Sequence, residues 1–517
     1  MKSRLLFGAL QSLVAVHTSS AAPIAAGDLL ELNACRDASF AAQQLVVRAS
    51  DSTVRTPDGA LCVTLAGPSP AQLAMQPCGG AAAAAQQWAY SAGKGGVFEQ
   101  AGAPGGCVAW NTQGGLLSSW PCSSEAWTGF FSIGAPAAGM ISANASAQQP
   151  AGMCVTAVGA PGGPCSDDTD CTLTGTCNAA TGVCSCFAPW TGADCGQLRF
   201  KALAAPARSN GYGQWPLSSW GGNAIFYDGL YHLIVAEMVN NCTLEYWGSN
   251  SQCTHATSAS PEGPYIKSDI AVGVWCHNPS LSYIPEENLW ALWHIGSGTG
   301  GNPPNCNSSA SAAAGPVSSP AASGSPLHLA KSPYGPWTPF TDWGLPDCNN
   351  PTQMQHPNGT WFIICDSTRM YRGPNVTGPF NYVLDVPTGP VHGTYEDGLL
   401  WMDVRGIWHV FFHVYTMTCD TPECDPTAIS GHSFSRDGLE WFRSPTQPYF
   451  TTANVTDGSV VQMSTRERPK LIFGANGEPT HLINGVDENP HCPPQAAIQC
   501  KVHGDHTQTL VVPLDFS

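Results

Sequence analysis

The chain has 517 residues, enough for roughly three or four domains of about 150 residues each. It carries 20 Lys and Arg against 37 Asp and Glu, and the net charge of −17 argues against binding to nucleic acid or to an anionic membrane surface. Only 11% of the residues are charged, whereas 55 are Gly and 43 are Pro, a composition typical of short β-strands joined by turns.

The N-terminus predicts a signal peptide over residues 1–21. Lys2 and Arg4 precede an apolar run over residues 5–16, and small residues follow at 19–22. The 22 cysteines predict disulfides and an oxidising compartment, so we expect a secreted, extracellular protein with no membrane anchor. Six N-x-S/T sequons fit a secreted glycoprotein, and they lie at Asn144, Asn241, Asn307, Asn358, Asn375 and Asn454.

Residues 28–160 contain a repeat that reads Cys-Val, a strand-length gap, Cys and then Trp. The two complete copies contain Cys62, Cys78 and Trp88, and Cys107, Cys122 and Trp127. A third copy is split between the two ends of the segment, at Cys154 and Cys35. Three repeats with one split copy indicate a closed threefold β structure, because the last strand must return to the first.

This repeat resembles that of the ricin-type β-trefoil lectins. With it we expect the disulfides Cys62–Cys78, Cys107–Cys122 and Cys35–Cys154. Sugar pockets in that family use an Asp shortly after the Cys-Val position, where this chain has Thr64, Ala109 and Thr156. Sugar binding by the trefoil and a role only as a spacer or docking unit therefore both stay open.

Six cysteines lie between residues 165 and 195, a segment too short to build a core without disulfides. Their spacing resembles an EGF-like module, which implies the pairs Cys165–Cys177, Cys171–Cys184 and Cys186–Cys195. Asp167, Asp168 and Asp170 are expected in a solvated loop rather than in a metal site. We expect a rigid spacer that can also contact other proteins.

Residues 198–517 repeat a polar pair, a strand-like run, a turn and a second apolar strand. Five copies of about 50–70 residues predict a five-bladed β-propeller, so the whole chain is expected to be all-β. The low-complexity run over residues 307–326 is expected to be a flexible surface insertion within the second blade. The five polar pairs are Gly222–Asn223, His277–Asn278, Asn349–Asn350, Glu396–Asp397 and Glu467–Arg468.

The five strand starts and the recurrent Gly-Pro-aromatic turns resemble the propellers of family 43 glycoside hydrolases. The resemblance implies a central pocket in which an Asp before Pro in the first blade acts as base, a second Asp orients, and a Glu donates a proton. The matching column here is Asn223, Asn278, Asn350, Asp397 and Arg468. Because the amide of Asn223 cannot accept the proton, standard hydrolysis is in doubt.

Successive strand residues face opposite ways, so Glu396 and Asp397 are not expected to point at the axis together. If the column of Asp397 faces the axis, the site has one carboxylate and resembles a hydrogen-bonding sugar cradle. If the first residue of each polar pair faces the axis instead, Glu396 and Glu467 can flank a glycosidic bond. Glu467 can also simply pair with a neighbouring arginine, and His277 can simply satisfy a strand end.

We therefore expect a secreted carbohydrate-active protein that acts on a glycan or binds one, the alternative being a non-catalytic glycan-binding or adhesion protein. Catalytic candidates are Glu396, as a proton donor whose pKa is raised by desolvation, with Asp397 and Glu467. No cofactor or metal is expected, and a closing-strand role is expected for His503 and His506. Candidate glycan-binding residues are Asn223, His277, Asn278, Asn349, Asn350, Trp220, Trp275 and Arg468.

The propeller cysteines suggest three pairs between near neighbours in sequence. These are Cys242–Cys253, Cys419–Cys424 and Cys492–Cys500. The sequence leaves the partners of Cys276, Cys306, Cys348 and Cys365 unassigned.

Overall fold

A computed structural model gives the architecture of the chain. It describes the strands between residues 29 and 158 with a few adjoining residues, and then residues 165–213, 217–306, 326–340, 345, 348–388, 394–415, 429–487 and 507–517. The predicted signal peptide, nearly all of the predicted insertion, and His503 and His506 lie outside these residues. No helix in the described part of the chain is long and apolar enough to cross a membrane.

The N-terminal segment is built from short antiparallel strands. Its first strand β1 pairs with its last strand β12, with Leu29 opposite Val158, so the two ends of the segment meet. The trefoil itself stays a prediction. The strands are β1 (Leu29–Ala34), β2 (Val46–Arg48), β3 (Thr53–Arg55), β4 (Leu61–Ala66), β5 (Gln72–Pro77), β6 (Trp88–Ser91), β7 (Val97–Gln100), β8 (Gly106–Trp110), β9 (Leu117–Pro121), β10 (Phe131–Ile133), β11 (Ile141–Ala143) and β12 (Met153–Val158).

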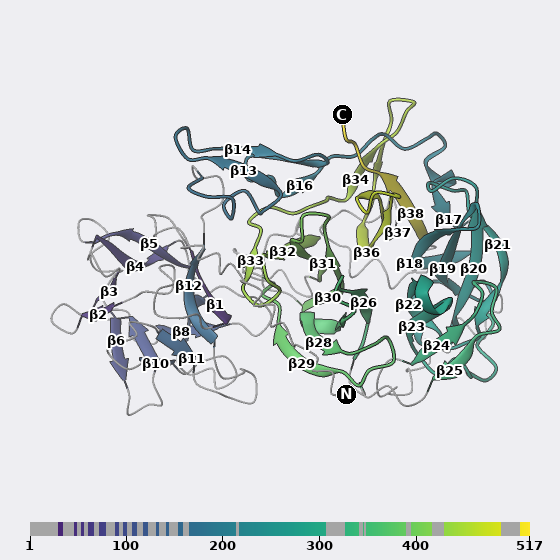
Figure 1. Cartoon of the computed structure of the whole chain (residues 1–517), viewed down its shortest axis with the longest axis horizontal. Coiled ribbons are helices and arrows are strands. Elements are labelled where there is room, and N and C mark those ends of the chain that lie inside the picture. The colour runs from purple at the N-terminus through teal and green to yellow at the C-terminus, as the bar shows by residue number, and fades with distance from the viewer. Residues whose placement is uncertain are drawn as a thin grey trace, which may run out of the picture.

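The C-terminal part is a five-bladed β-propeller of four-stranded antiparallel blades (Figure 1). The first strand of each blade contacts those of its two neighbours, in the order β18, β22, β26, β30, β36 and back to β18, so the ring is closed. Blades 1 and 2 are β18 (Ser218–Tyr227), β19 (Leu230–Met238), β20 (Ser251–Ser258) and β21 (Ile266–Val272), then β22 (His277–Ile284), β23 (Leu289–Ile295), β24 (Leu327–Ala330) and β25 (Thr338–Phe340).

Blades 3 and 4 are β26 (Thr352–Gln355), β27 (Trp361–Ile364), β28 (Arg369–Gly373) and β29 (Asn381–Asp385), then β30 (Thr394–Met402), β31 (Trp408–Tyr415), β32 (Ser430–Ser435) and β33 (Trp441–Arg443). Blade 5 is β36 (Thr465–Phe473), β37 (Pro479–Asp487), β38 (Gln508–Pro513) and β17 (Gly211–Tyr212). Between blades 4 and 5 the chain forms a hairpin of β34 (Thr452–Asn454) and β35 (Val460–Gln462). The one α-helix among the described residues is α1 (Trp247–Asn250), which follows β19.

The ring is closed by chain that precedes the first blade, because β17 is the outer strand of the last blade. The Tyr212 hydroxyl on β17 donates to Glu237 of blade 1. Glu237 is 3% exposed and also accepts from Lys267 Nζ at 2.7 Å and from Gln252 Nε2 at 3.0 Å. Because a buried carboxylate needs several donors, this network fixes the closing strand to its neighbour.

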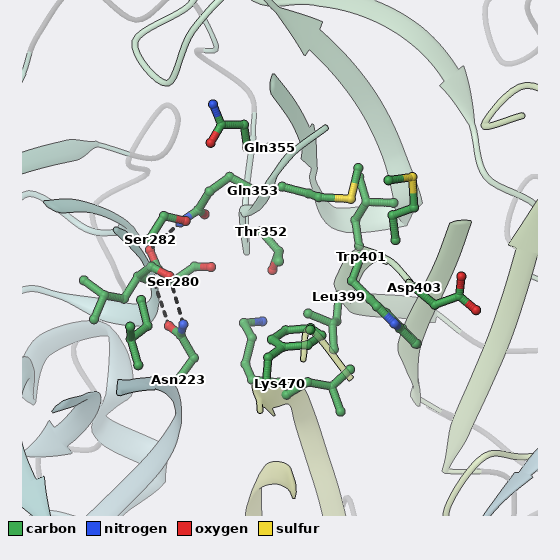
Figure 2. Close-up of a pocket in the computed structure, with 18 of the residues that line it drawn as sticks. Asn223, Ser280, Ser282, Thr352, Gln353, Gln355, Leu399, Trp401, Asp403 and Lys470 are labelled. Atoms are coloured by element: carbon green, nitrogen blue, oxygen red, sulfur yellow. Dashed lines mark hydrogen bonds between the residues drawn. The ribbon is translucent and has the colours of Figure 1, made fainter. Parts of the chain in front are cut away.

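The core consists of apolar layers between adjacent blades. Trp293 of blade 2 packs with Trp361 of blade 3, and Ile364 of blade 3 packs with Trp408 and Phe412 of blade 4. A pocket of about 750 Å³ lies on the axis beyond these layers (Figure 2). Because the apolar side chains are buried between blades rather than within one blade, the stability of each blade depends on its neighbours.

The described propeller cysteines do not pair as their spacing suggests. The prediction Cys242–Cys253 is wrong: Cys242 pairs with Cys306, and Cys253 pairs with Cys276. Cys253 lies within β20 beside the start of the next blade, so both bonds join blade 1 to the chain of blade 2. The third disulfide is Cys348–Cys365, whereas the predicted pairs Cys419–Cys424 and Cys492–Cys500 lie outside the described residues.

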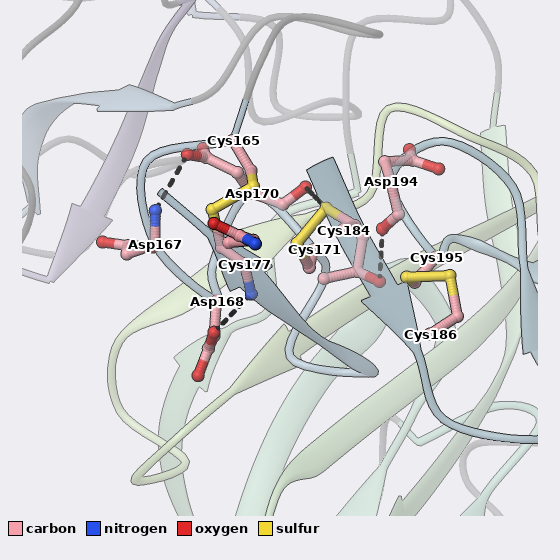
Figure 3. The surroundings of a disulfide bond; sticks show 12 residues. Cys165, Asp167, Asp168, Asp170, Cys171, Cys177, Cys184, Cys186, Asp194 and Cys195 are labelled. Atoms are coloured by element: carbon pink, nitrogen blue, oxygen red, sulfur yellow. Dashed lines mark hydrogen bonds between the residues drawn. A yellow bond between two sulfur atoms is a disulfide. The ribbon is translucent and has the colours of Figure 1, made fainter. Parts of the chain in front are cut away.

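The EGF-like segment contains the three disulfides that the resemblance implies (Figure 3). Its strands pair as two small hairpins, β13 (Gly175–Asn178) with β14 (Val183–Cys186) and β15 (Trp190–Thr191) with β16 (Gln197–Leu198). The carboxylates in its first loop accept local N–H groups: Asp170 from Ser166 at 2.7 Å, and Asp168 from Cys177 at 2.8 Å. They act as turn caps, in line with the expected loop.

In the N-terminal segment the structure contains Cys62–Cys78. The expected pairs Cys35–Cys154 and Cys107–Cys122 each include a cysteine outside the described residues. Seven described disulfides and an EGF-like domain fit an extracellular protein. The described sequon asparagines are exposed and available to a glycan, namely Asn241, Asn358, Asn375 and Asn454.

The EGF-like segment is packed against blade 4 rather than held away from it. Trp190 is 5% exposed, and its ring stacks on that of His432 with centroids 5.1 Å apart. Its edge contacts Phe411, and both belong to one apolar cluster with Leu399. The Leu198 N–H also donates to the Pro448 carbonyl at 2.9 Å. The expected rigid spacer is therefore a docked part of the propeller.

Replacing Trp190 by Ala should loosen this docking. Deleting a buried Trp side chain costs about 3–5 kcal/mol, and here the loss falls on the contact with β31 and β32. We expect faster hydrogen exchange in these two strands and a lower unfolding midpoint. Val183→Ala is the matched control, because Val183 lies in the same segment and is 61% exposed. Equal effects of the two variants would contradict the docking.

Candidate functional site

A β-bulge interrupts four inner strands near their starts. The pairing register shifts between Trp220 and Asn223, His277 and Ser280, Glu396 and Leu399, and Glu467 and Lys470. Each bulge has a left-handed backbone at its first residue, in the first blade also at the following Gly222 (94°), and the chain just before β26 has such a residue at the matching place. These residues, with their φ angles, are Gly221 (61°), Asn278 (51°), Asn350 (46°), Asp397 (64°) and Arg468 (57°).

This register changes which residue of the first blade is equivalent to Asn278, Asn350, Asp397 and Arg468 of the other blades. Gly221, not Asn223, stands where Asn278 and Asp397 stand in their blades. Asn223 instead takes the place of Ser280, and its amide is held in place: Nδ2 donates to the Leu281 carbonyl at 2.9 Å, and Oδ1 accepts from the Leu281 N–H at 2.6 Å. Asn223 therefore joins blade 1 to blade 2, and it lies beyond the strand-start residues.

The left-handed residues meet around the axis. Asn278 donates to Asn350, and Arg468 forms an ion pair with Asp397. Arg468 also fills the place that Gly221 leaves, because a Cβ on Gly221 would lie 2.9 Å from the Cβ of Arg468. The first-blade position thus has no carboxylate, and the aliphatic part of the Arg468 side chain occupies its space.

Glu396 and Asp397 lie in one cluster, so the prediction that only one of them faces the axis is wrong. The left-handed backbone at Asp397 breaks the strand alternation, because a bulge re-aims the side chains beside it. His413 Nδ1 lies 3.5 Å from Glu396 and 3.9 Å from Asp397, while its Nε2 lies 3.7 Å from Glu467. His413 therefore stands between the two glutamates.

The carboxylates of this cluster differ in exposure and in protonation. The side chain of Glu396 is 25% exposed, against 1% for Asp397 and 3% for Glu467. Burial raises the pKa of Glu396, but the hydrogen bond from His413 and the charge of Arg468 outweigh it, so the net shift is downward. The expected rise in the pKa of Glu396 is therefore wrong.

Asp366, which sequence reasoning missed, has the opposite shift. It lies in a 3-10 turn (Asp366–Thr368) after β27, and its N–H donates to the Asn349 carbonyl at 2.9 Å. Burial and the charge of Glu396 raise the pKa of Asp366 to about 6, against the opposing charge of Arg468. No pattern marked it, because it comes from the second turn of its blade rather than from a strand start.

The predicted aromatic platforms are buried. Trp220 is 1% exposed and packs against Gly485, and Trp275 is 6% exposed. Trp247 of α1 is 38% exposed, and its ring lies 5.1 Å from that of His277. Trp247 thus offers an aromatic face beside the start of β22.

His277 and Glu467, which the sequence also predicted for the site, are buried within the protein. His277 is 1% exposed, and burial together with the charge of Arg468 holds its pKa well below the usual range, so it is neutral. Arg466 does not pair with Glu467; its guanidinium lies over the rings of Phe200 and Tyr449. Glu467 accepts from the Thr465 hydroxyl at 2.6 Å.

One group of side chains has the composition of a metal site. One ligand atom each from Glu396, Asp397, His413 and Glu467 lies within 4.8 Å of all the others. Carboxylate oxygens suit a hard divalent cation, but Asp397 is already bound to Arg468. The guanidinium supplies the positive charge that an ion would bring.

Comparisons with known proteins give a family for one segment only. Residues 165–195 match the model of the EGF-like domain, and no curated protein matches the chain. Among solved structures, a family 117 glycoside hydrolase of the marine bacterium Zobellia galactanivorans is 12% identical, with a TM-score of 0.38 over 62% of this chain and 91% of that one.

Two further solved structures show the same degree of similarity. The α-L-arabinofuranosidase of Podospora anserina is 10% identical, with a TM-score of 0.39 over 61% of this chain and 95% of that one. A thermostable family 43 glycoside hydrolase is 12% identical, with a TM-score of 0.40 over 61% of this chain and 93% of that one. At these values the likeness carries no information on activity.

Removing the Arg468 charge should destabilise the propeller. Breaking a buried ion pair costs about 3–5 kcal/mol, because the remaining charge is left unpaired. We expect Arg468→Met to lower the free energy of unfolding by this order, and Asp397→Asn in the same chain to restore most of the loss. Arg372→Met, at an exposed arginine, is the control. A double variant as unstable as Arg468→Met would contradict the pairing.

Asp366→Asn should stabilise the protein in a pH-dependent way. The native pKa of about 6 lies above the ordinary value of Asp, so ionising Asp366 costs stability as the pH rises from about 4 to 6. We expect the variant to gain about 2 kcal/mol more over the unmodified protein at pH 7 than at pH 4. Denaturant titrations at both pH values measure this, and an equal gain at both would contradict the shift.

Proposed function

We propose that the propeller is the glycan-binding part of an extracellular protein and that it binds a saccharide at the starts of its inner strands. The observation that carries this proposal is the packing of Arg468 against Gly221 and its ion pair with Asp397. In the family 43 pattern the first-blade position holds the base. Here glycine supplies no base, so binding without the standard hydrolysis is favoured.

The exposed polar groups suit a ligand with several hydroxyls. Glu396 is 25% exposed and ionised, and Arg468 is 14% exposed, so the site offers a charged acceptor beside a charged donor. Hydrogen bonds to charged groups are worth about 1.5–3 kcal/mol each. Trp247 adds a flat apolar face on which the C–H side of a sugar ring can lie.

Glu396→Gln should weaken glycan binding about tenfold or more, because it removes the charge from that hydrogen bond. A glycan array with the full chain identifies the ligand, and calorimetry measures its affinity. Glu286→Gln, at an exposed glutamate away from the strand starts, is the matched control. Finding no glycan ligand, or finding equal affinities for the two variants, would refute the proposal.

Binding should be constant across neutral pH. Because the pKa of Glu396 is lowered, its carboxylate stays ionised down to below the ordinary value of about 4.3. We expect a flat affinity from pH 8 to pH 5 and a decline only at lower pH. A decline centred near pH 6 would point to Asp366 as the ligand-binding carboxyl instead.

Hydrolysis is the second candidate, and the opposite pKa shifts of Asp366 and Glu396 favour it. Two carboxyl groups whose pKa values are pushed apart can divide the roles of acid and base. In this case Asp366 is the proton donor and Glu396 stays ionised. Glu467 is 3% exposed, so a substrate can approach it less readily than it can approach Glu396.

Turnover separates the two candidates. If the protein hydrolyses a glycoside, Asp366→Asn should lower the rate by about 10²–10⁴ on a poor leaving group and by much less on an activated aryl glycoside. Equal losses on both substrates would exclude Asp366 as the acid. Binding of an oligosaccharide with no turnover would support the binding function and not hydrolysis.

A further inference from the structure

The pocket of about 750 Å³ lies at the other end of the axis from the carboxylate cluster. Its lining comes from residues that follow the bulges and from turns after the inner strands, such as residues 403–406 and Gly477. The Asn278–Asn350 hydrogen bond and the Asp397–Arg468 ion pair precede these residues on their strands, so they separate the two ends. The polar lining residues are Asn223, Ser280, Ser282, Thr352, Gln353, Gln355, Asp403, Arg405 and Lys470.

Two buried oxygens in this lining have no hydrogen-bond partner among the described residues. They are Thr352 Oγ1 and Gln353 Oε1, on side chains of residues 3% and 8% exposed. The orientation of Gln353 is fixed, because its Nε2 donates to the Ser280 carbonyl at 3.0 Å and to Ser282 Oγ at 2.8 Å. Buried polar groups are normally satisfied, so these oxygens point to a missing partner.

Lys470 brings a cation to the same pocket. The residue is 8% exposed, and within the described chain its Nζ donates only to the Pro469 carbonyl, at 3.3 Å. Figure 2 shows its amine and the Thr352 hydroxyl facing each other across the pocket. Asp403, the carboxylate in the lining, is held by Arg405 and by the Ile407 N–H, so it does not neutralise Lys470.

We propose that this pocket binds a small hydroxylated carboxylate of the sugar-acid class. The Lys470 ammonium pairs with the carboxylate of the ligand, the Thr352 hydroxyl donates to it, and Gln353 Oε1 accepts from a ligand hydroxyl. Leu399 and Trp401 supply apolar lining for the carbon skeleton. Few fixed polar groups on apolar walls are typical of small-molecule sites.

D-glucuronate is the probe, and D-glucose is its neutral control. Calorimetry on the full chain at pH 7 should find glucuronate bound at least tenfold more tightly than glucose. Lys470→Met should lower the glucuronate affinity at least tenfold, and Thr352→Val should lower it several-fold. Glu396→Gln, at the other end of the axis, should leave it unchanged.

The affinity should also depend on pH in one direction. Burial lowers the pKa of Lys470 to about 8; the nearby charge of Asp397 favours the ammonium, and that of Arg468 opposes it. Glucuronate binding should therefore weaken as the pH rises above about 8, when the amine loses its proton.

Several outcomes would overturn this inference. They are no binding of glucuronate, equal affinity for glucose, or a loss with Glu396→Gln that Lys470→Met does not produce. Should Lys470→Met fail to fold, Gln353→Glu serves instead, because a carboxylate at that position should repel the sugar acid and spare glucose. Failure here leaves glycan binding at the strand starts intact, since that binding responds to Glu396.

Discussion

The left-handed residue near each inner strand start is the constraint on which the rest of the site depends. A regular strand would send adjacent side chains to opposite faces. A residue with positive φ at the matching place in every blade breaks that alternation around the whole ring. Glycine, asparagine and aspartate adopt this backbone readily, whereas Arg468 adopts it at a cost that its ion pair with Asp397 helps to offset.

The ion pair also decides the electrostatics of the axis. Asp366, Glu396, Asp397 and Glu467 all lie near Arg468, and its guanidinium lowers the energy of their ionised forms. Glu396 also gains a hydrogen bond from His413 and stays ionised, whereas Asp366 lacks that bond and holds its proton more tightly. The difference between the two carboxyls thus arises from their neighbours, not from burial alone.

Much of the fold followed from the sequence. Five polar pairs before strand-like runs led to the five blades, and the spacing of six cysteines led to the EGF-like disulfides. The register of the first blade did not follow, because Gly221–Gly222 and the Asn223 beside it allow two alignments that only strand pairing separates. The pairing of Cys242 with Cys306 failed for a similar reason, since the blade order brings together residues 64 apart.

The sequence predicted some of the candidate site residues and missed others for a similar reason. Glu396, Asp397 and Arg468 were found because they occupy strand starts, whereas Asp366, His413 and Trp247 come from second strands and turns that carry no repeat. The docked EGF-like segment was also unexpected, because nothing in its cysteine spacing signals that Trp190 is buried against blade 4. Contacts between one repeat and another depend on how the chain folds, and the sequence pattern of a single repeat does not contain them.

The most direct measurement is a crystal structure of the full chain after long incubation with the oligosaccharide that a glycan array selects. We expect an intact saccharide at the inner strand starts, with hydroxyls on Glu396 and Arg468 and a ring against Trp247, and with the Arg468–Asp397 pair unbroken. A cleaved sugar there, or Arg468 withdrawn from Asp397 with a water in its place beside Gly221, would contradict it.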